Sequence, residues 1–294
     1  MRDPTSATLF AAARSRLWAW TRPHLSELVY VNGGLGDELM LTAVVRAARI
    51  ADRPVHVLTD LPCLWTGNTD PLSVQTGVET WHYARRRGWI TTEFRHLAYQ
   101  TSAPGHLALQ MAAHLGLTLP GDWRPLVPWP SAAARDSRLV VVQNSCRGAR
   151  YAATTKEWPQ DRWRELSRRL GKEFELVQLG TVHDPVLPHA VDRRGRTTLP
   201  QAAEILGKAG LFIGLESGLQ HLAAAMHTPA VIIFGGRSRP QETGYLFNCN
   251  LTRSPACAGC GLNDGCPHSL VCLDIPVAEV EAAVRAKLSV PRVG

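Results

Sequence analysis

The chain has 294 residues, of which 45% are hydrophobic and 19% charged, with a formal net charge of +7 and an isoelectric point near 9.3. This length allows two domains that each bury their own core, and the composition is that of a soluble globular protein. No window of 18 or more uninterrupted apolar residues is present, and the start lacks the apolar core of a signal peptide. The sequence therefore excludes a membrane-spanning helix and predicts a cytoplasmic protein.

Residues 1–26 are predicted to form an amino-terminal helical extension. Apolar residues recur there at helical spacing, and arginines lie between them. Such a helix either docks on the body of the protein or lies on a membrane surface, which would place the protein at the inner face of the membrane.

The positive charge indicates attraction to anions, a class that includes nucleic acid, anionic lipid and phosphorylated small molecules. Arginines cluster at 85–87 and 193–196, and no zinc-finger, helix-turn-helix or aromatic RNA-binding pattern accompanies them. Ordinary solvated surface is the interpretation we favour for both clusters, and nucleic acid stays open as a partner.

The first α/β half spans residues 27–130. It opens as a βαβ unit with a glycine-rich crossover turn. The predicted elements are strand 28–31, turn 32–37, helix 38–50 and strand 54–58, followed by strands near 79–83 and 94–99 and a helix over 106–117. Four prolines and two tryptophans between Pro120 and Pro130 indicate a linker.

The glycine turn ends in Asp37. Its pattern, Gly-Gly-Leu-Gly-Asp, lacks the third glycine of the dinucleotide-binding fingerprint. Asp37 is either a helix cap or a general base that takes a proton from an attacking hydroxyl.

The second half, residues 131–294, repeats the alternation of strands and helices. The predicted elements are strand 138–145, helix 163–170, strand 174–179, helix 199–209, strand 211–214, helix 218–227 and strand 230–234. Two doubly wound domains joined by a linker would place their strand ends on either side of a cleft. The fold class is therefore α/β, with two facing Rossmann-like domains.

The turn Glu216-Ser217-Gly218 is the most informative segment. It follows a buried strand and opens a helix, where free backbone N–H groups and the helix dipole favour an anionic ligand. Taken alone, Ser217 is as consistent with a helix cap as with a ligand-binding residue. His221 taken alone is more typical of a packed core residue. A carboxylate, a hydroxyl and an imidazole at one strand end favour a ligand site.

Three cations, Arg147, Arg150 and Lys156, lie in the loop after the first strand of the second half. Lys156 is the one we expect to neutralise charge on a departing diphosphate, and Arg237 is a further candidate for phosphate contact. The alternative is that these are solvated loop charges.

Four of the seven cysteines, Cys257, Cys260, Cys266 and Cys272, crowd into 16 residues with the spacing C-x2-C-x5-C-x5-C. In a chain without a secretion signal this pattern favours a structural zinc or iron site over reduced thiols or disulfides. Four thiolate ligands leave no open position for chemistry, so such a metal would not be catalytic.

These segments together resemble the heptosyltransferase-like family of inverting glycosyltransferases, glycosyltransferase family 9, which includes the ADP-heptose:lipopolysaccharide heptosyltransferases. The likeness covers about Leu28 to Leu288. It rests on GLGDELMLTAVVRA, KEWP, ELVQLGTVHD, ESGLQHLAAAMHTPAVIIFG and the cysteine-rich tail. The resemblance implies a GT-B arrangement, with the acceptor on the amino-terminal domain, the nucleotide-sugar on the carboxy-terminal domain and no catalytic metal.

The resemblance also implies roles for single residues. Asp37 matches the proposed catalytic base and Lys156 the lysine that contacts the donor phosphate. The donor-binding residues it implies are Gly34, Gly36, Arg150, Gly180, Thr181, Glu216, Ser217, Gly218, Leu219, His221 and Arg237.

Two positions depart from the family pattern. Glu216 stands where the family usually has Asp, and Val182 stands where some members place a ribose-binding glutamate. The four-cysteine tail resembles that of members that modify protein side chains, including autotransporter heptosyltransferases with a bound iron.

The predicted function is inverting transfer of a sugar, a heptose from ADP-heptose by resemblance, to a hydroxyl of a glycan, lipopolysaccharide core or related glycoconjugate. One alternative is a glycosyltransferase that acts on protein or DNA. Another is a catalytically idle protein that binds nucleotide-sugars or nucleic acid.

Overall fold

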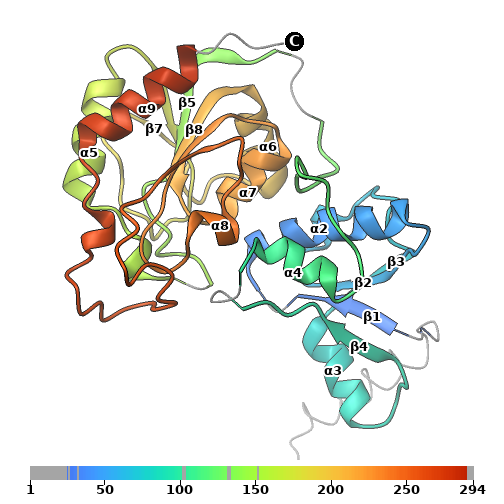
Figure 1. Ribbon diagram of the computed structural model, residues 1–294. Helices are drawn as coiled ribbons and strands as arrows, with labels where there is room; N and C mark the ends of the chain where they lie inside the picture. Colours follow the sequence, from blue (N-terminus) through green and yellow to red (C-terminus); the bar gives the residue numbers. More distant parts are fainter. Residues whose placement is uncertain are drawn as a thin grey trace, which may run out of the picture.

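The computed structural model describes residue 25 and residues 27–31, 33–100, 104–130, 134–150 and 152–289 (Figure 1). Residues 1–24 lie outside this range, so the predicted amino-terminal helix and its membrane contact stay predictions. Within the described part of the chain, no helix has the length and apolar character needed to cross a membrane.

The amino-terminal half is built on a four-stranded parallel sheet in the order β3-β2-β1-β4. Its strands are β1 Glu27–Tyr30, β2 His56–Thr59, β3 Ser73–Thr76 and β4 Glu93–His96, and its helices are α2 Leu35–Ile50, α3 Val78–Arg86 and α4 Leu107–Ala113, with a short 3₁₀ turn, η1, at Pro62–Leu64. Helices α2 and α4 pack together, whereas Trp81 of α3 packs with Leu28 and Leu58 in a separate cluster.

The predicted strand at 79–83 is wrong, because these residues lie inside α3. Gly77 adopts a left-handed φ of 84° before the helix, and Trp81 and Ala84, three residues apart, form its buried face. The alternation of apolar and polar residues over five positions is too short to separate a strand from such a helix.

The carboxy-terminal half is built on a six-stranded parallel sheet in the order β10-β9-β8-β5-β6-β7. Its strands are β5 Asp136–Val142, β6 Glu175–Gln178, β7 Val191–Asp192, β8 Ala209–Leu215, β9 Ala230–Ile233 and β10 Cys249–Leu251. Its helices are α5 Gln160–Leu170, α6 Leu199–Lys208, α7 Gly218–Ala225, α8 Pro240–Thr243 and α9 Val277–Ser289, with 3₁₀ turns η2 at Thr154–Lys156 and η3 at Val271–Leu273.

Every residue of β8 and β9 is buried, as expected of central strands in a parallel sheet that is covered on both faces. Helices α5 and α9 cover one face, and α6 and α7 cover the other (Figure 1). The α6 and α7 face shares one continuous hydrophobic cluster with α2 of the first half. The two halves are therefore packed against each other through α2 and α7.

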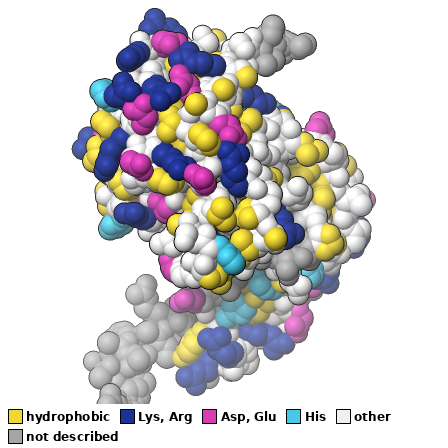
Figure 2. All heavy atoms as spheres, turned by 60° about the vertical axis from the view of Figure 1, so that its left-hand side comes forward, with side chains coloured by type: hydrophobic (Ala, Val, Ile, Leu, Met, Phe, Trp, Pro, Cys, Tyr) yellow, Lys and Arg dark blue, Asp and Glu magenta, His cyan; other side chains and the backbone are white. Residues whose placement is uncertain are grey.

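The outer face of the second half carries cations and carboxylates side by side (Figure 2). There Arg169 binds Glu165 and Glu281, and Arg285 binds Glu173 and Glu281. The two arginine clusters noted in the sequence are also partly paired, through Arg85–Glu93 and Arg194–Asp192. This pairing breaks up the positive charge that a nucleic-acid backbone would need.

Candidate active site

A cavity of about 540 Å³ lies between the two halves, and we call it the interdomain cavity. All thirteen predicted catalytic and donor-binding residues line it: Gly34, Gly36, Asp37, Arg150, Lys156, Gly180, Thr181, Glu216, Ser217, Gly218, Leu219, His221 and Arg237. Arg147 does not line the cavity; its side chain is 59% exposed and pairs with Glu157.

The topology explains why these residues meet. Each sheet has a switch point, between β1 and β4 in the first and between β5 and β8 in the second, where successive connections leave in opposite directions. The segments that follow these four strands, including the first turn of α2, all reach the cavity. They supply Asp37 after β1, Tyr99 after β4, Lys156 after β5 and Glu216 after β8.

Asp37 is held by two donors. Its Oδ2 accepts a hydrogen bond from the Gly34 amide at 2.8 Å in a capping box at the start of α2, and its Oδ1 accepts the hydroxyl of Tyr99. Burial raises the pKa of Asp37, and the two hydrogen bonds oppose that rise. Asp37 is thus both a helix cap and a cavity carboxylate whose affinity for a proton is increased, as a general base requires.

Tyr99 was not predicted as a site residue. It is the last residue of the predicted strand 94–99, and no sequence pattern marks it as a site residue. Burial and the adjacent Asp37 carboxylate raise the pKa of Tyr99, so its hydroxyl stays protonated and donates to Asp37.

Lys156 and Glu216 form an ion pair inside the cavity, with Nζ and Oε2 2.5 Å apart. Only 14% of the lysine side chain and 8% of the glutamate side chain are exposed. Lys156 ends the η2 turn, which is fixed by hydrogen bonds from Thr154 and Thr155 to the carbonyls of Asn263 and Leu262. The pair places one cation and one carboxylate where a diphosphate and a sugar hydroxyl would each find a partner.

Ser217 precedes α7 but does not cap it with its side chain. Its hydroxyl donates to Oε1 of Gln143, at the end of β5, at 2.5 Å. Gln143 is therefore a second cavity residue that the sequence did not mark. The start of α7 therefore has no side-chain cap, and such a helix N-terminus favours an anionic ligand.

His221 lines the cavity but is almost fully buried, as the core interpretation predicted. Its Nδ1 is hydrogen-bonded to the Tyr245 hydroxyl at 2.7 Å, and its ring lies against Gly36, where an added Cβ would approach Cδ2 to 2.8 Å. Burial lowers the pKa of His221 to about 3, so the ring is neutral. The ring packs α7 against the glycine turn.

The turn after β6 presents Thr181 and Asp184 to the cavity. Asp184 accepts hydrogen bonds from the amides of Thr181 at 2.7 Å and Gly148 at 3.4 Å, and thereby fixes the turn. Val182, in the same turn, is 65% exposed and lies outside the cavity wall. The carboxylate that this turn presents to the cavity is that of Asp184, two residues later.

Comparison with known proteins relates the second half of the chain to a known family. Residues 131–260 match the model of glycosyltransferase family 9 (heptosyltransferase). This part of the chain is therefore similar to glycosyltransferase family 9. Lipopolysaccharide heptosyltransferase 1 of Salmonella typhimurium is 26% identical over 112 residues, which cover 35% of this chain and 34% of that protein. The chain thus matches about a third of the length of this relative.

Solved structures extend the likeness to the fold of both halves. Escherichia coli ADP-heptose lipopolysaccharide heptosyltransferase II has a TM-score of 0.64 and 16% identity, over 90% of this chain and 98% of that one. The iron-containing dodecameric glycosyltransferase TibC of enterotoxigenic E. coli has a TM-score of 0.69 and 19% identity, over 90% of this chain and 76% of that one, and TibC has also been solved with ADP-D-β-D-heptose. The GT-B fold predicted from the sequence is confirmed.

The cysteine-rich tail begins within the matched residues 131–260 and lies close to Gly236. Cys260 and Cys272 lie beside Gly236, where an added Cβ would be 3.7 and 3.0 Å from their Sγ atoms. Across the described residues, however, no three Cys, His, Asp or Glu side chains are arranged to hold a metal ion. The arrangement of the thiols therefore does not fit the predicted metal site, and no step of the chemistry below involves one.

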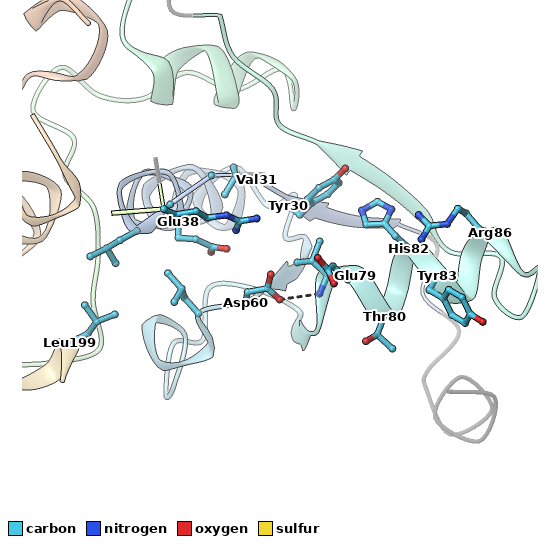
Figure 3. Close-up of a pocket in the computed structure, with 16 residues that line it drawn as sticks. Tyr30, Val31, Glu38, Asp60, Glu79, Thr80, His82, Tyr83, Arg86 and Leu199 are labelled. Carbon is cyan, nitrogen blue, oxygen red and sulfur yellow. Dashed lines mark hydrogen bonds between the residues drawn. The ribbon is translucent and has the colours of Figure 1, made fainter. Parts of the chain in front are cut away.

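A second and larger cavity, of about 930 Å³, is lined mostly by residues of the amino-terminal half (Figure 3). We call it the amino-terminal cavity. It shares Gly34, Leu35, Arg150 and Leu199 with the interdomain cavity, so the two meet at the glycine turn. The site therefore offers one compartment on each side of the Asp37 turn.

Proposed function

We propose that the protein is an inverting glycosyltransferase that moves a sugar from a nucleotide-sugar in the interdomain cavity to an acceptor hydroxyl. The observation that carries this proposal is the meeting of Asp37, from one sheet, with the Lys156–Glu216 pair, from the other, in one cavity. A base and a cation on opposite sides of a compartment are what displacement of a diphosphate requires.

The reaction follows from these positions. Asp37 takes the proton of the acceptor hydroxyl, whose oxygen bonds to the anomeric carbon from the face opposite the nucleotide. The bond between that carbon and the phosphate oxygen breaks, and its electron pair leaves with the nucleoside diphosphate. The negative charge that grows on the diphosphate is faced by Lys156, Arg237 and the N–H groups at the start of α7. Glu216 accepts a hydrogen bond from a hydroxyl of the transferred sugar.

ADP-heptose is the donor we propose. Two facts support this choice: residues 131–260 match a family described as heptosyltransferase, and TibC, which shares the fold, has been solved with ADP-D-β-D-heptose. Val182 offers no carboxylate at its position in the turn after β6, and both oxygens of Asp184, in the same turn, already accept hydrogen bonds from backbone amides. We therefore propose that other groups recognise the ribose. Thr181, Thr197 and Thr198 line that end of the cavity and offer hydroxyls.

The donor site is tested by calorimetric titration of the full chain with ADP, GDP, UDP and CDP, and then with the matching nucleotide-sugars. We expect ADP and ADP-heptose to bind most tightly. The variant Arg237→Gln is expected to weaken ADP binding about tenfold, whereas Arg147→Gln, a control cation outside the cavity, leaves it unchanged. Binding of none of the four diphosphates would contradict the proposal.

A protein that only binds nucleotide-sugars is separated from an enzyme by Asp37→Asn. Asparagine keeps the shape and one oxygen, which can accept from Tyr99, but it loses the acceptor for the Gly34 amide and cannot take a proton. A transferase loses turnover and keeps ADP binding, whereas a binding protein has no turnover to lose.

A further inference from the structure

The side chains that line the amino-terminal cavity indicate which chemical class of acceptor it binds. The family 9 match covers residues 131–260, whereas most of the walls of this cavity come from residues 30–86. The acceptor class is therefore to be inferred from the side chains of this chain. The inference rests on the proposed function, because it concerns the acceptor of that same site.

Carboxylates line the end of this cavity near the glycine turn. Glu38 belongs to α2, Asp60 follows β2, and Glu79 begins α3 (Figure 3). Glu38 is only 5% exposed and is fixed by Thr59, whose hydroxyl donates to its Oε2 at 2.9 Å. Asp60 is fixed by the Val78 amide, which donates to its Oδ1 at 3.1 Å. These carboxylates are held in place by the fold and are ready to accept hydrogen bonds.

Aromatic rings form the middle of the cavity. Tyr30 and His82 meet edge to face, with ring centroids 5.2 Å apart, and Tyr83 lies on the same helix as His82. Burial and the nearby Arg86 lower the pKa of His82, so its ring is neutral near pH 7. Arg86 stands beyond these rings, at the far end from Glu38 (Figure 3).

We propose that the amino-terminal cavity binds an uncharged sugar ring as the acceptor, with its hydroxyls on Glu38 and Asp60 and an apolar ring face on Tyr30 and His82. Rigid aromatic walls with a few fixed polar groups are the usual means of binding a small, hydroxyl-rich ligand. Because Gly34 and Leu35 belong to both cavities, a ring bound here presents a hydroxyl toward Asp37.

The same carboxylates exclude anionic acceptors. A phosphate or carboxylate on the ring would lie close to Glu38, Asp60 and Glu79, and like charges in a partly enclosed site repel each other strongly. Two arginines also line the described walls of the cavity: Arg150 lies where it meets the interdomain cavity, and Arg86 stands beyond the aromatic rings (Figure 3). The three carboxylates outnumber these two cations, so the charge of the cavity selects against an anionic sugar.

The test measures binding of matched saccharides to the full chain saturated with ADP, by ligand-observed NMR titration. The probes are glucose, galactose and mannose, each as the methyl glycoside, the 6-phosphate and the uronic acid. We expect at least one methyl glycoside to bind at least ten times more tightly than its two anionic counterparts. Glu38→Gln and Asp60→Asn are expected to reduce this preference at least threefold each, and Glu93→Gln, an exposed carboxylate on the same sheet, to leave it unchanged.

Two outcomes would overturn the assignment. One is an anionic sugar that binds as tightly as its methyl glycoside. The other is an absence of saccharide binding by protein that still binds ADP, which would leave the donor site standing and point to a peptide or another acceptor. Loss of ADP binding itself would instead contradict the proposed function, so the two failures are distinguishable.

Discussion

Replacing Glu38 with Gln is expected to make the protein more stable at pH 8 and to change its stability little at pH 5. Burial, opposed by the Thr59 hydrogen bond and assisted by the charges of Asp60 and Asp37, raises the pKa of the Glu38 carboxyl from 4.5 to about 7. Between pH 4.5 and about pH 7, Glu38 therefore holds a proton in the native state that it releases in the unfolded chain. The stability contributed at this position therefore falls as the pH rises through that window.

The magnitude follows from the two pKa values. At about 1.36 kcal/mol per pH unit, their separation amounts to about 3 kcal/mol of free energy of unfolding that the wild type lacks above pH 7. Glutamine cannot ionise and keeps an oxygen for the Thr59 hydroxyl. The stability gap between variant and wild type is therefore expected to grow from about 1 kcal/mol or less at pH 5 to about 3 kcal/mol at pH 8.

Urea unfolding of both proteins at pH 5, 6, 7 and 8 measures this gap, with Glu93→Gln as a control for loss of an exposed carboxylate. A gap that stays the same from pH 5 to pH 8 would refute the reasoning. A gain in stability together with loss of saccharide binding would show that this buried charge is retained for function.

Three further variants test the interdomain cavity. Tyr99→Phe removes a hydrogen bond that favours the ionised form of Asp37, so the acidic limb of the pH profile of kcat/KM is expected to move to higher pH, and an unmoved limb would separate Tyr99 from the base. Lys156→Ala leaves the buried Glu216 without its cation and is expected to lower the free energy of unfolding, measured in urea, by about 3–5 kcal/mol. The double variant Lys156→Ala/Glu216→Ala is expected to recover most of this loss, and equal losses in both variants would contradict the pairing. Gly36→Ala pushes a methyl group against His221 and is expected to cost about 1–3 kcal/mol, an effect that Gly121→Ala, with open space around its Cα, does not share.

Most of the fold follows from local sequence patterns. The strands at β1, β5, β6, β8 and β9 are short apolar runs, and turn signals bound them. Strand β3, Ser-Val-Gln-Thr, was missed because its residues are largely polar and it forms the edge of its sheet. Helix α3 was mistaken for a strand because its apolar residues are few.

The site was predictable where residues lie between a buried strand and the next long helix, or in the first turn of that helix. Asp37, in the first turn of α2, Lys156, in η2 before α5, and Glu216, between β8 and α7, satisfy that condition. The switch points of the two sheets bring these segments together. Tyr99 and Gln143 act through long-range partners, 62 and 74 residues away in the chain, so no local pattern could reveal them. The amino-terminal cavity depends on the packing of three separate segments and was likewise hidden.

The most direct test of the central claim compares wild type and Asp37→Asn in two assays: calorimetric binding of ADP, and release of ADP from ADP-heptose in the presence of the saccharide panel. We predict that ADP binds both proteins within about twofold of the same affinity, whereas the variant releases ADP at least about 100 times more slowly. A variant that turns over as fast as wild type would contradict the assignment of Asp37 as the base and, with it, the proposed transfer between the two cavities.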